Sequence, residues 1–232
     1  MRVAFVPCFI LSALLLACGG DDNADSEPFA PDGLDAARLL SDASLAVAGL
    51  QGFHFVLTQE DATIPLPSNL ELESAEGDVV LPDRLAAELE AEIQDTNVSV
   101  DTIAIGGETW ITNPFTRRWQ KLNADLRNYA DFGALLPALL PAIKDAAVIG
   151  EAVLDDVATY LVAGACSSAE LQAALPFSSP GHEVRVEVWI GVEDSLPRRV
   201  RVIGRLISDE SGDAVRQIDL TRLNQPVRIN PP

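Results

Sequence analysis

The segment VRVEVWIGVE, residues 184–193, has the clearest strand pattern in the chain. Its apolar residues occupy every second position from Val184 to Val192, and this period of two is typical of a strand with one buried face. Two further alternating segments follow after short turns, at 198–207 and 214–222. Short connections between such strands predict an antiparallel meander that buries one face of a sheet.

Three segments nearer the N-terminus can also be assigned. Residues 34–50 have apolar side chains at helical spacing and end at glycines, so we expect a helix there. Residues 52–60, GFHFVLTQE, read as a strand. Residues 98–112 read as a hairpin, because Gly106 and Gly107 supply the positive φ angles that a tight turn needs.

Two segments are harder to assign. Residues 84–93, RLAAELEAEI, fit a helix by composition and a strand by alternation, and we favour the strand. Residues 124–150 are rich in Ala and Leu but contain Pro137 and Pro141, which predicts short helical pieces rather than one long helix. The predicted fold class is α+β, with one curved antiparallel sheet and helices on its inner side.

The N-terminus has the pattern of a bacterial lipoprotein signal. Apolar residues fill 3–17 after Arg2, a run shorter than the roughly 20 residues that span a bilayer. The sequence LLAC that follows matches a lipobox and makes Cys18 the expected lipidation site. A soluble secreted protein cut nearby, or an uncleaved anchor, stays an alternative. The expected organisation is a signal peptide at 1–17, an acidic flexible tether at 18–33 and a single domain at 34–232.

The charge of the chain excludes some partners. The chain has 16 basic and 35 acidic residues, a net charge of −19 that becomes −20 if cleavage removes Arg2. Nucleic acids need a basic surface, so none is expected to bind. The same charge argues against adhesion to anionic lipid, so acyl chains would have to hold the protein at the membrane.

Neither a metal site nor a catalytic centre is predicted. Cys166 would have no disulfide partner once Cys8 leaves with the signal and Cys18 carries lipid, so it is expected to be a small buried residue. His54 and His182 are isolated, and the chain has no CxxC, HExxH or GxSxG pattern. We therefore expect no cofactor, no metal and no enzymatic activity.

Eight stretches of the chain, taken in order, resemble the LppX/LprA/LprF/LprG family of bacterial lipoproteins. No single stretch is diagnostic, but their order covers essentially the whole mature domain. They are LLAC (15–18), LLSDASLAVAGLQGFHF (39–55), AEGDVVLP (75–82), VSVDTIAIGGETWIT (98–112), ADFGALLPALLPAIKDA (130–146), VLDDVATYLVAG (153–164), VEVWIGVEDSLPRRVRV (186–202) and IDLTRLNQPVRINPP (218–232).

The resemblance implies a half-barrel sheet wrapped around helices, with a large apolar cavity that takes acyl chains of membrane lipids or glycolipids. It further implies a monomer, anchored through Cys18 to the outer face of the cytoplasmic membrane, that carries such lipids within the cell envelope. A lipid transporter is a candidate partner. The family has no catalytic residues to carry over. The unusual acidity of this chain and its unpaired Cys166 leave the identity of the lipid open.

Alternation alone predicts only a buried face, and an ordinary core is the simpler interpretation of it. With the resemblance, some of these side chains are expected to line a cavity. The candidates from the strands are Phe53, Phe55, Leu57, Val186, Val188, Ile190, Val200, Val202, Ile218 and Leu220. The candidates from the helical segment are Leu135, Leu136, Leu139, Leu140 and Ile143.

Two sets of side chains have alternative roles. Arg199, Arg201 and Arg205 either bind lipid headgroups or pair with carboxylates such as Glu187 and Asp219 on a solvated face, and we favour the pairing. The tryptophans either reach a membrane interface or pack at the edge of the sheet, and we favour the packing. They are Trp110, Trp119 and Trp189.

Two functions of different classes remain. The first is a membrane-anchored protein that binds and carries acylated lipids. The second is a surface lipoprotein with a solid core that acts as an assembly or interaction partner. An internal cavity favours the first function, and an exposed apolar patch over a filled interior favours the second.

Overall fold

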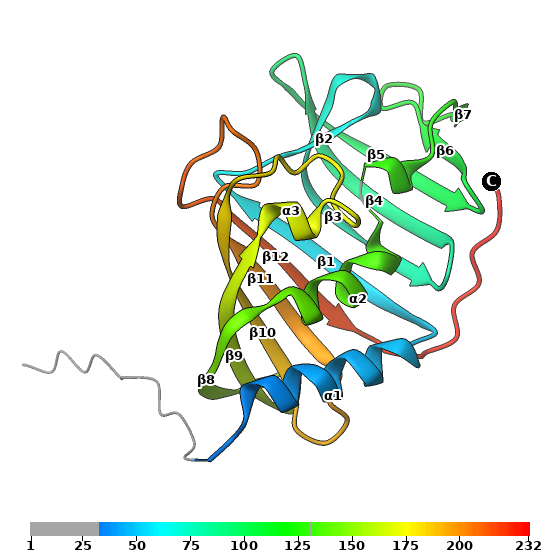
Figure 1. Ribbon diagram of the computed structural model, residues 1–232. Helices are drawn as coiled ribbons and strands as arrows, with labels where there is room; N and C mark the ends of the chain where they lie inside the picture. The colour runs from blue at the N-terminus through cyan, green and yellow to red at the C-terminus, as the bar shows by residue number, and fades with distance from the viewer. Residues whose placement is uncertain (1–32, 130) are drawn as a thin grey trace, which may run out of the picture.

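In the computed structural model, which describes residues 33–129 and 131–232, strands pair in a 12-stranded antiparallel sheet (Figure 1). Along the sheet the order is β7-β6-β5-β4-β3-β1-β12-β11-β10-β9-β8, and β2 pairs with β3. The strands are β1 (Gly52–Glu60), β2 (Ile64–Leu66), β3 (Leu70–Val80), β4 (Arg84–Ile93), β5 (Thr96–Ile105), β6 (Glu108–Thr112), β7 (Trp119–Leu122), β8 (Lys144–Leu154), β9 (Val157–Ser167), β10 (Glu183–Gly191), β11 (Pro197–Ile203) and β12 (Val215–Thr221). The antiparallel pairing of β1 with β12 joins the two halves of the chain.

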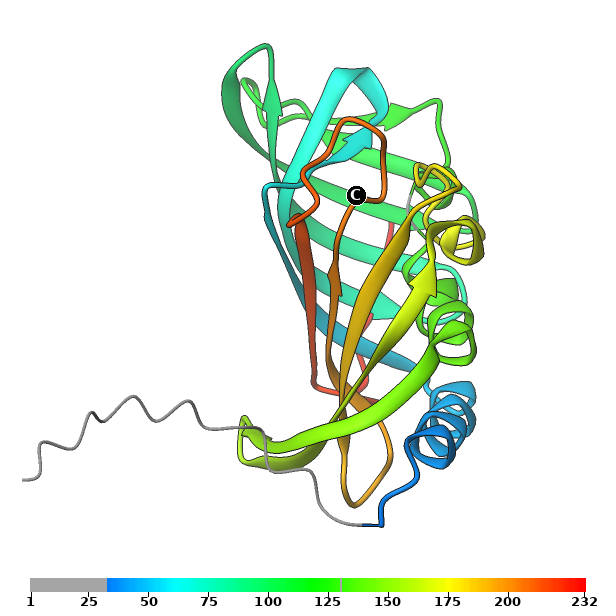
Figure 2. The same cartoon turned by 60° about the vertical axis from the view of Figure 1, so that its left-hand side comes forward.

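The helices lie in a row along the concave side of this curved sheet (Figure 2). They are α1 (Ala36–Ala48), α2 (Phe132–Ala142) and α3 (Ser168–Leu171), with single 3₁₀ turns at Pro67–Asn69 and Leu126–Asn128. In this row α2 packs against both α1 and α3. The predicted class, α+β with a curved antiparallel sheet around helices, is confirmed.

The first helix forms for the reasons that its sequence indicates. The side chain of Asp35 caps α1 by accepting hydrogen bonds from the backbone N–H groups of Ala37 and Arg38. The buried residues Leu40 and Val47 fall on one face of the helix, which turns them towards the sheet interior.

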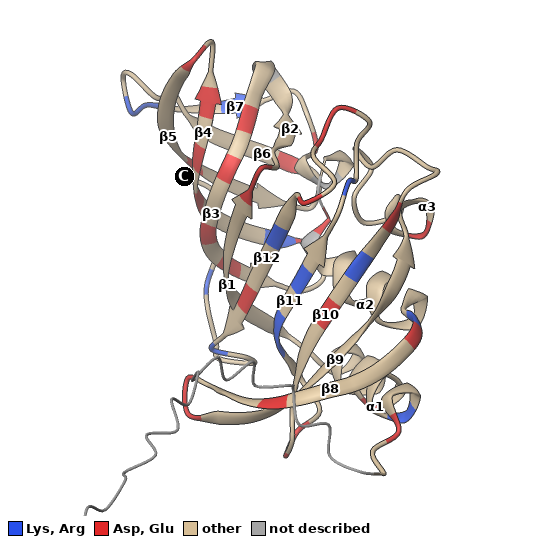
Figure 3. Cartoon of the chain, turned by 90° about the vertical axis from the view of Figure 1, so that its left-hand side faces the viewer, with Lys and Arg blue, Asp and Glu red and all other residues tan. Residues whose placement is uncertain are grey.

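The ambiguous segment 84–93 is a strand, as we favoured. It forms β4 between β3 and β5, with Leu89 buried on the inner side. Its glutamates face outwards, where Glu88 lies opposite Glu76 of β3. The outer side of β3 and β4 is therefore strongly acidic (Figure 3). Like charges opposite each other do not stabilise a sheet, so the apolar inner face must hold these strands.

The prediction for residues 124–150 is partly wrong. One continuous helix, α2, includes both Pro137 and Pro141, and residues from Lys144 onwards form the strand β8. The two prolines are spaced by four, so they share one face of α2, and both are exposed. Proline removes a helix N–H group, and a solvent-facing position tolerates that loss because water can satisfy the free carbonyl.

The strand predicted at 198–207 ends earlier than expected. β11 stops at Ile203 because Gly204 adopts a φ of 121° and turns the chain into a loop. Arg205 therefore belongs to the loop before β12 and not to the strand face of Arg199 and Arg201, where we expected it.

The signal peptide, the lipidation site Cys18 and nearly all of the tether lie outside the described residues. Among the residues that the structure does describe, none of the helices has the length and apolar character needed to cross a membrane.

Candidate functional site

The residues that we predicted to line a cavity converge in the interior between α2 and the sheet. The strands β1, β10, β11 and β12 contribute from the concave face, and α2 with its C-cap residue contributes from the opposite side. All of them belong to the hydrophobic core, with Leu135 only partly buried. They are Phe53, Phe55, Leu57, Leu135, Leu136, Leu139, Leu140, Ile143, Val186, Val188, Ile190, Val200, Val202, Ile218 and Leu220.

An apolar cavity lies under α2, and its volume is about 40 Å³. Such a volume has room for one or a few waters and is far below the roughly 300–1,000 Å³ of small-molecule pockets. Six of our candidates line it: Leu57, Leu135, Leu139, Val200, Val202 and Ile218. The other lining residues, which the sequence analysis missed, are Ile64, Asp131, Leu175, Arg216 and Gln217.

The remaining candidates do not border this cavity. Leu140 and Ile143 border a wider hollow of about 430 Å³ beside α1, and Leu220 borders one of about 760 Å³ near the turn between β8 and β9. Phe55, Val186, Val188 and Ile190 have no exposed surface. The large void that the resemblance implies is therefore absent from this part of the described interior, which side chains fill instead.

A second, separate cavity lies under the N-terminal half of the sheet, with a volume of about 100 Å³. Leu89 of β4, Val100 of β5 and Ile111 of β6 form its sheet side, and Leu126 lies on the other side. We did not predict this cavity, although the alternation in 84–93 and 98–112 already placed these side chains on one face.

Arg216 is the unexpected member of the first cavity. It lies on the inner face of β12 with Ile218 and Leu220, and its side chain is only 5% exposed. Its Nη2 atom donates to the carboxylate of Glu210 and to the backbone oxygen of Thr63. A charged side chain thus contributes to a mostly apolar wall. The sequence carried this signal, because a strand that buries Ile218 and Leu220 also turns position 216 inwards.

The N-terminus of α2 forms the other polar edge of this cavity. Asp131 lines the cavity, and its Oδ1 atom accepts a hydrogen bond of 3.0 Å from the N–H group of Ala134. This contact caps the helix and fixes where α2 begins. An arginine on the sheet and an aspartate on the helix therefore border the same small apolar space.

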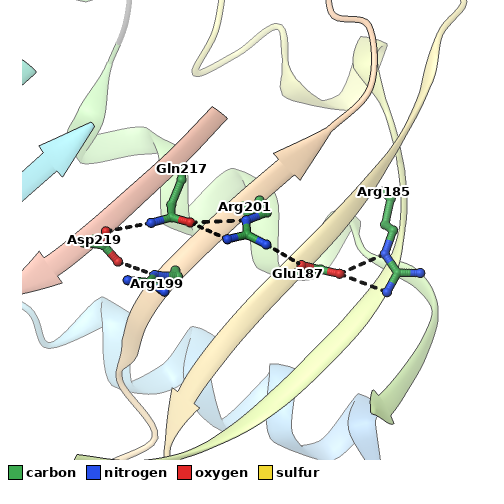
Figure 4. A network of polar contacts seen from close by, with 6 residues as sticks. All are labelled: Arg185, Glu187, Arg199, Arg201, Gln217 and Asp219. Atoms are coloured by element: carbon green, nitrogen blue, oxygen red, sulfur yellow. Dashed lines mark hydrogen bonds and ion pairs between the residues drawn. The ribbon is translucent and has the colours of Figure 1, made fainter. Parts of the chain in front are cut away.

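The outer-face arginines are paired across the strands, as we favoured (Figure 4). Arg199 of β11 donates to Asp219 of β12, and Arg201 donates to Gln217 with an Nη2–Oε1 distance of 2.7 Å. Arg201 also lies 3.6 Å from Glu187 of β10. These pairs lie on the convex side, and of their members Gln217 also borders the cavity under α2.

The tryptophans occupy three different environments. Trp189 lies in the middle of β10 under the guanidinium groups of Arg199 and Arg201, at 5.6 and 5.5 Å from the ring centre. It is 7% exposed, so the predicted packing at the edge of the sheet is wrong for this residue. Trp119 is on the terminal strand β7, and Trp110 is on the neighbouring β6 beside Lys121.

Cys166 is a buried free thiol on β9, as predicted. Burial raises the pKa of its thiol to about 11, so the thiolate is scarce at neutral pH. Nearby, an exposed ion pair with Glu170 raises the pKa of Lys144. Within the described ranges, no three His, Cys, Asp or Glu side chains gather closely enough to hold a metal ion.

The sequence and the fold have recognisable relatives. A model of the LppX_LprAFG lipoprotein family matches residues 35–229 of the chain. A search of curated proteins gives no match.

Two crystal structures are similar over most of their length. The first is LprF from Mycobacterium bovis, with a TM-score of 0.68 and 19% identity over 85% of this chain and 96% of that one. The second is the lipoprotein LppX from Mycobacterium tuberculosis, with a TM-score of 0.61 and 18% identity over 84% of this chain and 98% of that one. At these identities the similarity shows a shared fold.

Proposed function

The chain belongs to the LppX_LprAFG lipoprotein family, and on that premise we propose that it binds acyl chains of membrane lipids or glycolipids between α2 and the concave face of its sheet. We further propose that it carries them within the cell envelope while anchored through Cys18 at the outer face of the cytoplasmic membrane. In this proposal 1–17 is the signal peptide, 18–33 the tether and 34–232 a single lipid-binding domain. The domain acts as a monomer and without catalysis, and a lipid transporter is its candidate partner.

The observation that carries the proposal is the apolar cavity under α2. The cavity lies between the helix and the sheet, and eight of its eleven lining residues are apolar. The described part of α2 packs on the sheet through apolar side chains and is not a member of the strand ladders. Moving α2 away would therefore enlarge the cavity and leave the sheet ladders intact.

A small cavity is what an unloaded carrier of this kind should have. Empty volume costs about 24 cal/mol per Å³, so a dry void of about 500 Å³ would cost on the order of 10 kcal/mol. That cost is comparable to the whole stability of a domain. An interior that closes when empty and opens around a ligand avoids it.

Two features of α2 would make it easier to displace from the sheet, its prolines and its apolar contacts. Pro137 and Pro141 each lack a backbone N–H group, which removes hydrogen bonds from the middle of α2. Leu136, Leu139 and Leu140 hold the helix to the sheet through apolar contacts, which an acyl chain can replace with similar ones. The exchange is nearly balanced, because the lipid leaves one apolar environment for another.

The alternative is a lipoprotein with a solid core that acts as an interaction or assembly module. The filled interior around Phe55, Val186 and Val188 favours this second function. An exposed apolar patch would favour it further, but the most exposed large apolar residues lie on separate elements. They are Leu45 on α1, Phe115 in the loop before β7 and Val153 on β8.

Lipid uptake tests the proposal. The full-length chain with Cys18→Ser, which removes the predicted anchor, would be incubated with vesicles that contain dipalmitoylglycerol and then analysed by native mass spectrometry. We expect a species with bound lipid. A single mass without lipid, from both mild purification and incubation, would favour the interaction module.

A matched pair of substitutions locates the binding site. Leu135→Trp places a large ring in the cavity under α2, whereas Leu45→Trp adds the same ring on the exposed side of α1. We expect only the first variant to lose uptake, with both melting curves close to that of the parent chain. Equal uptake by both variants would place the lipid elsewhere.

A further inference from the structure

We infer that Arg216 binds the uncharged carbonyl oxygen of an ester-linked acyl chain at the polar end of the cavity under α2. This inference rests on the proposed function and narrows it, because it names the chemical group next to the hydrocarbon that the site recognises. It selects acyl esters over ethers and free acids with the same tails.

The first reason is the set of donors that Arg216 leaves unused. Its Nη2 atom is engaged by Glu210 and Thr63, but its Nε and Nη1 atoms are buried and have no hydrogen-bond partner among the described residues. The Phe177 ring, whose centre is 5.6 Å from the guanidinium carbon, makes a cation–π contact and accepts none of these hydrogen bonds. Buried donors without acceptors are unfavourable, so an incoming oxygen acceptor gains from meeting them.

The neighbouring strand does not supply this acceptor. Gln59 of β1 lies directly opposite Arg216 in the sheet. Its amide nitrogen donates to the backbone oxygens of Leu72 and Glu73, while its own Oε1 atom is buried without a partner in the described part of the chain. An acceptor and a donor thus stand at paired positions without bonding, and the free N–H groups of Arg216 are left for a ligand.

The second reason is the charge balance, which selects an uncharged acceptor. The carboxylate of Glu210 has a side chain only 6% exposed and already neutralises the guanidinium. Asp131 adds another negative charge on the wall of the same cavity. A carboxylate or phosphate would therefore enter a buried site whose fixed charge is negative, which is costly at low dielectric. An ester carbonyl accepts the same hydrogen bonds and brings no net charge.

The third reason is the position of Arg216 relative to the apolar wall. Leu57, Val200 and Ile218 line the cavity with it, and Arg216 stands two positions from Ile218 on the inner face of β12, opposite Val202 of β11. A hydrocarbon chain that lies along this face therefore meets the Arg216 side chain after Ile218. In an acyl ester the carbonyl is bonded directly to that chain. The geometry thus matches one ligand feature, a polar acceptor immediately after a long apolar run.

Three probes with the same tail length test the inference. Dipalmitoylglycerol carries ester carbonyls, dihexadecylglycerol replaces them with ethers, and palmitic acid carries a carboxylate. Their binding to the full-length Cys18→Ser chain would be measured by competition against a fluorescent acyl lipid. Two hydrogen bonds to otherwise unpaired donors should make the diester bind about tenfold or more tightly than the diether.

A double substitution links this preference to Arg216. Arg216→Met with Glu210→Gln removes the guanidinium without leaving a buried carboxylate, and the amide oxygen of the introduced glutamine can still accept hydrogen bonds from the N–H groups of Leu206 and Ile207. We expect diester affinity to fall to the diether value, with diether affinity unchanged. The control is Arg205→Met, which alters an exposed arginine in the loop that carries Glu210 and should keep the preference for the diester.

The outcomes are distinguishable. Equal binding of diester and diether by the parent chain would overturn the inference and leave the proposed function standing. Tightest binding of palmitic acid, lost in the double variant, would overturn it by making Arg216 an anion site. No binding of any probe would overturn both the inference and the proposed function.

Discussion

The strands β11 and β12 carry arginines on both faces, and the two faces treat them differently. On the convex face, Arg199 and Arg201 are partly exposed and pair with side chains of neighbouring strands (Figure 4). On the concave face, Arg216 is almost completely buried, pairs with Glu210 and keeps unused donors. The chemical group is the same, and only its surroundings differ.

The different surroundings of these arginines imply different contributions to stability. Exposed ion pairs are worth about 0–1 kcal/mol, because water and salt screen them. A buried pair loses much of its attraction to desolvation, so it is weak support for stability on its own. The outer arginines therefore keep an outer face soluble and ordered, whereas Arg216 needs another explanation, for which we propose ligand binding.

The largest expected loss of stability comes from removing a large side chain from the inner face of the sheet. Phe55 of β1 is fully buried, and Phe55→Ala should lower the free energy of unfolding by about 3–5 kcal/mol through lost burial and a new cavity. The neighbouring Val56 points to the other face, so Val56→Ala should cost less than about 1 kcal/mol. Urea denaturation measures both values, and similar losses would contradict the assignment of the two faces.

The next effect comes from removing the buried cation alone. Arg216→Met leaves the Glu210 carboxylate buried without its counterion and should cost about 3 kcal/mol. Adding Glu210→Gln should recover most of that loss in the same denaturation experiment. If the double variant is as unstable as the single one, Arg216 contributes by packing rather than by its charge.

A smaller effect concerns the buried thiol of the inner face, and it depends on pH. A cysteine in the unfolded chain titrates near pH 8.5, whereas burial raises the pKa of Cys166 to about 11. As the pH rises from about 8.5 to 11 the unfolded chain loses its proton first, so this group lowers the stability over that range.

Comparison with Cys166→Ala isolates this thiol from the other titrating groups. Relative to that variant, the parent chain should lose about 2 kcal/mol between pH 8 and 11, measured by urea denaturation. A stability difference that stays constant with pH would show that the thiol is more solvated than its burial indicates.

The smallest expected loss of stability comes from removing an arginine of the outer face. Arg201→Met removes the contacts to Gln217 and Glu187, and we expect a loss of about 1 kcal/mol or less. The loss should shrink further in high salt, because ions screen partly exposed pairs. A loss as large as that of Arg216→Met would mean that burial does not separate the arginines of the two faces.

The sequence predicted most of the sheet correctly, because alternation is a local property. The strands at 84–93 and 184–193 and the hairpin at 98–112 were each readable from side-chain parity within one segment. The same parity would have placed Arg216 on the inner face. Two predictions were wrong for local reasons. The prolines of α2 suggested a broken helix, and Gly204 ends β11 before the expected position.

The sequence predicted which residues face the interior, but not which of them border the cavity. Each of the fifteen candidate residues lies in the interior or at its border, as parity and helical spacing indicate. Which six of them border the cavity was not predictable, because that depends on how closely α2 approaches β1, β11 and β12. Residues from other elements, Ile64 and Leu175, complete the wall and gave no local signal.

Three properties can be read from the sequence without a structure: which side chains face inwards, the lipidation signal at Cys18 and the acidity of the chain. Only the tertiary structure decided the volume left between α2 and the sheet, and which N–H groups of Arg216 find a partner. The orientation of a side chain, inwards or outwards, follows from the pleat of its own strand. A cavity is instead the small difference between a space enclosed by several elements and the side chains that fill it, and hydrogen-bond satisfaction depends on atoms brought together from distant segments.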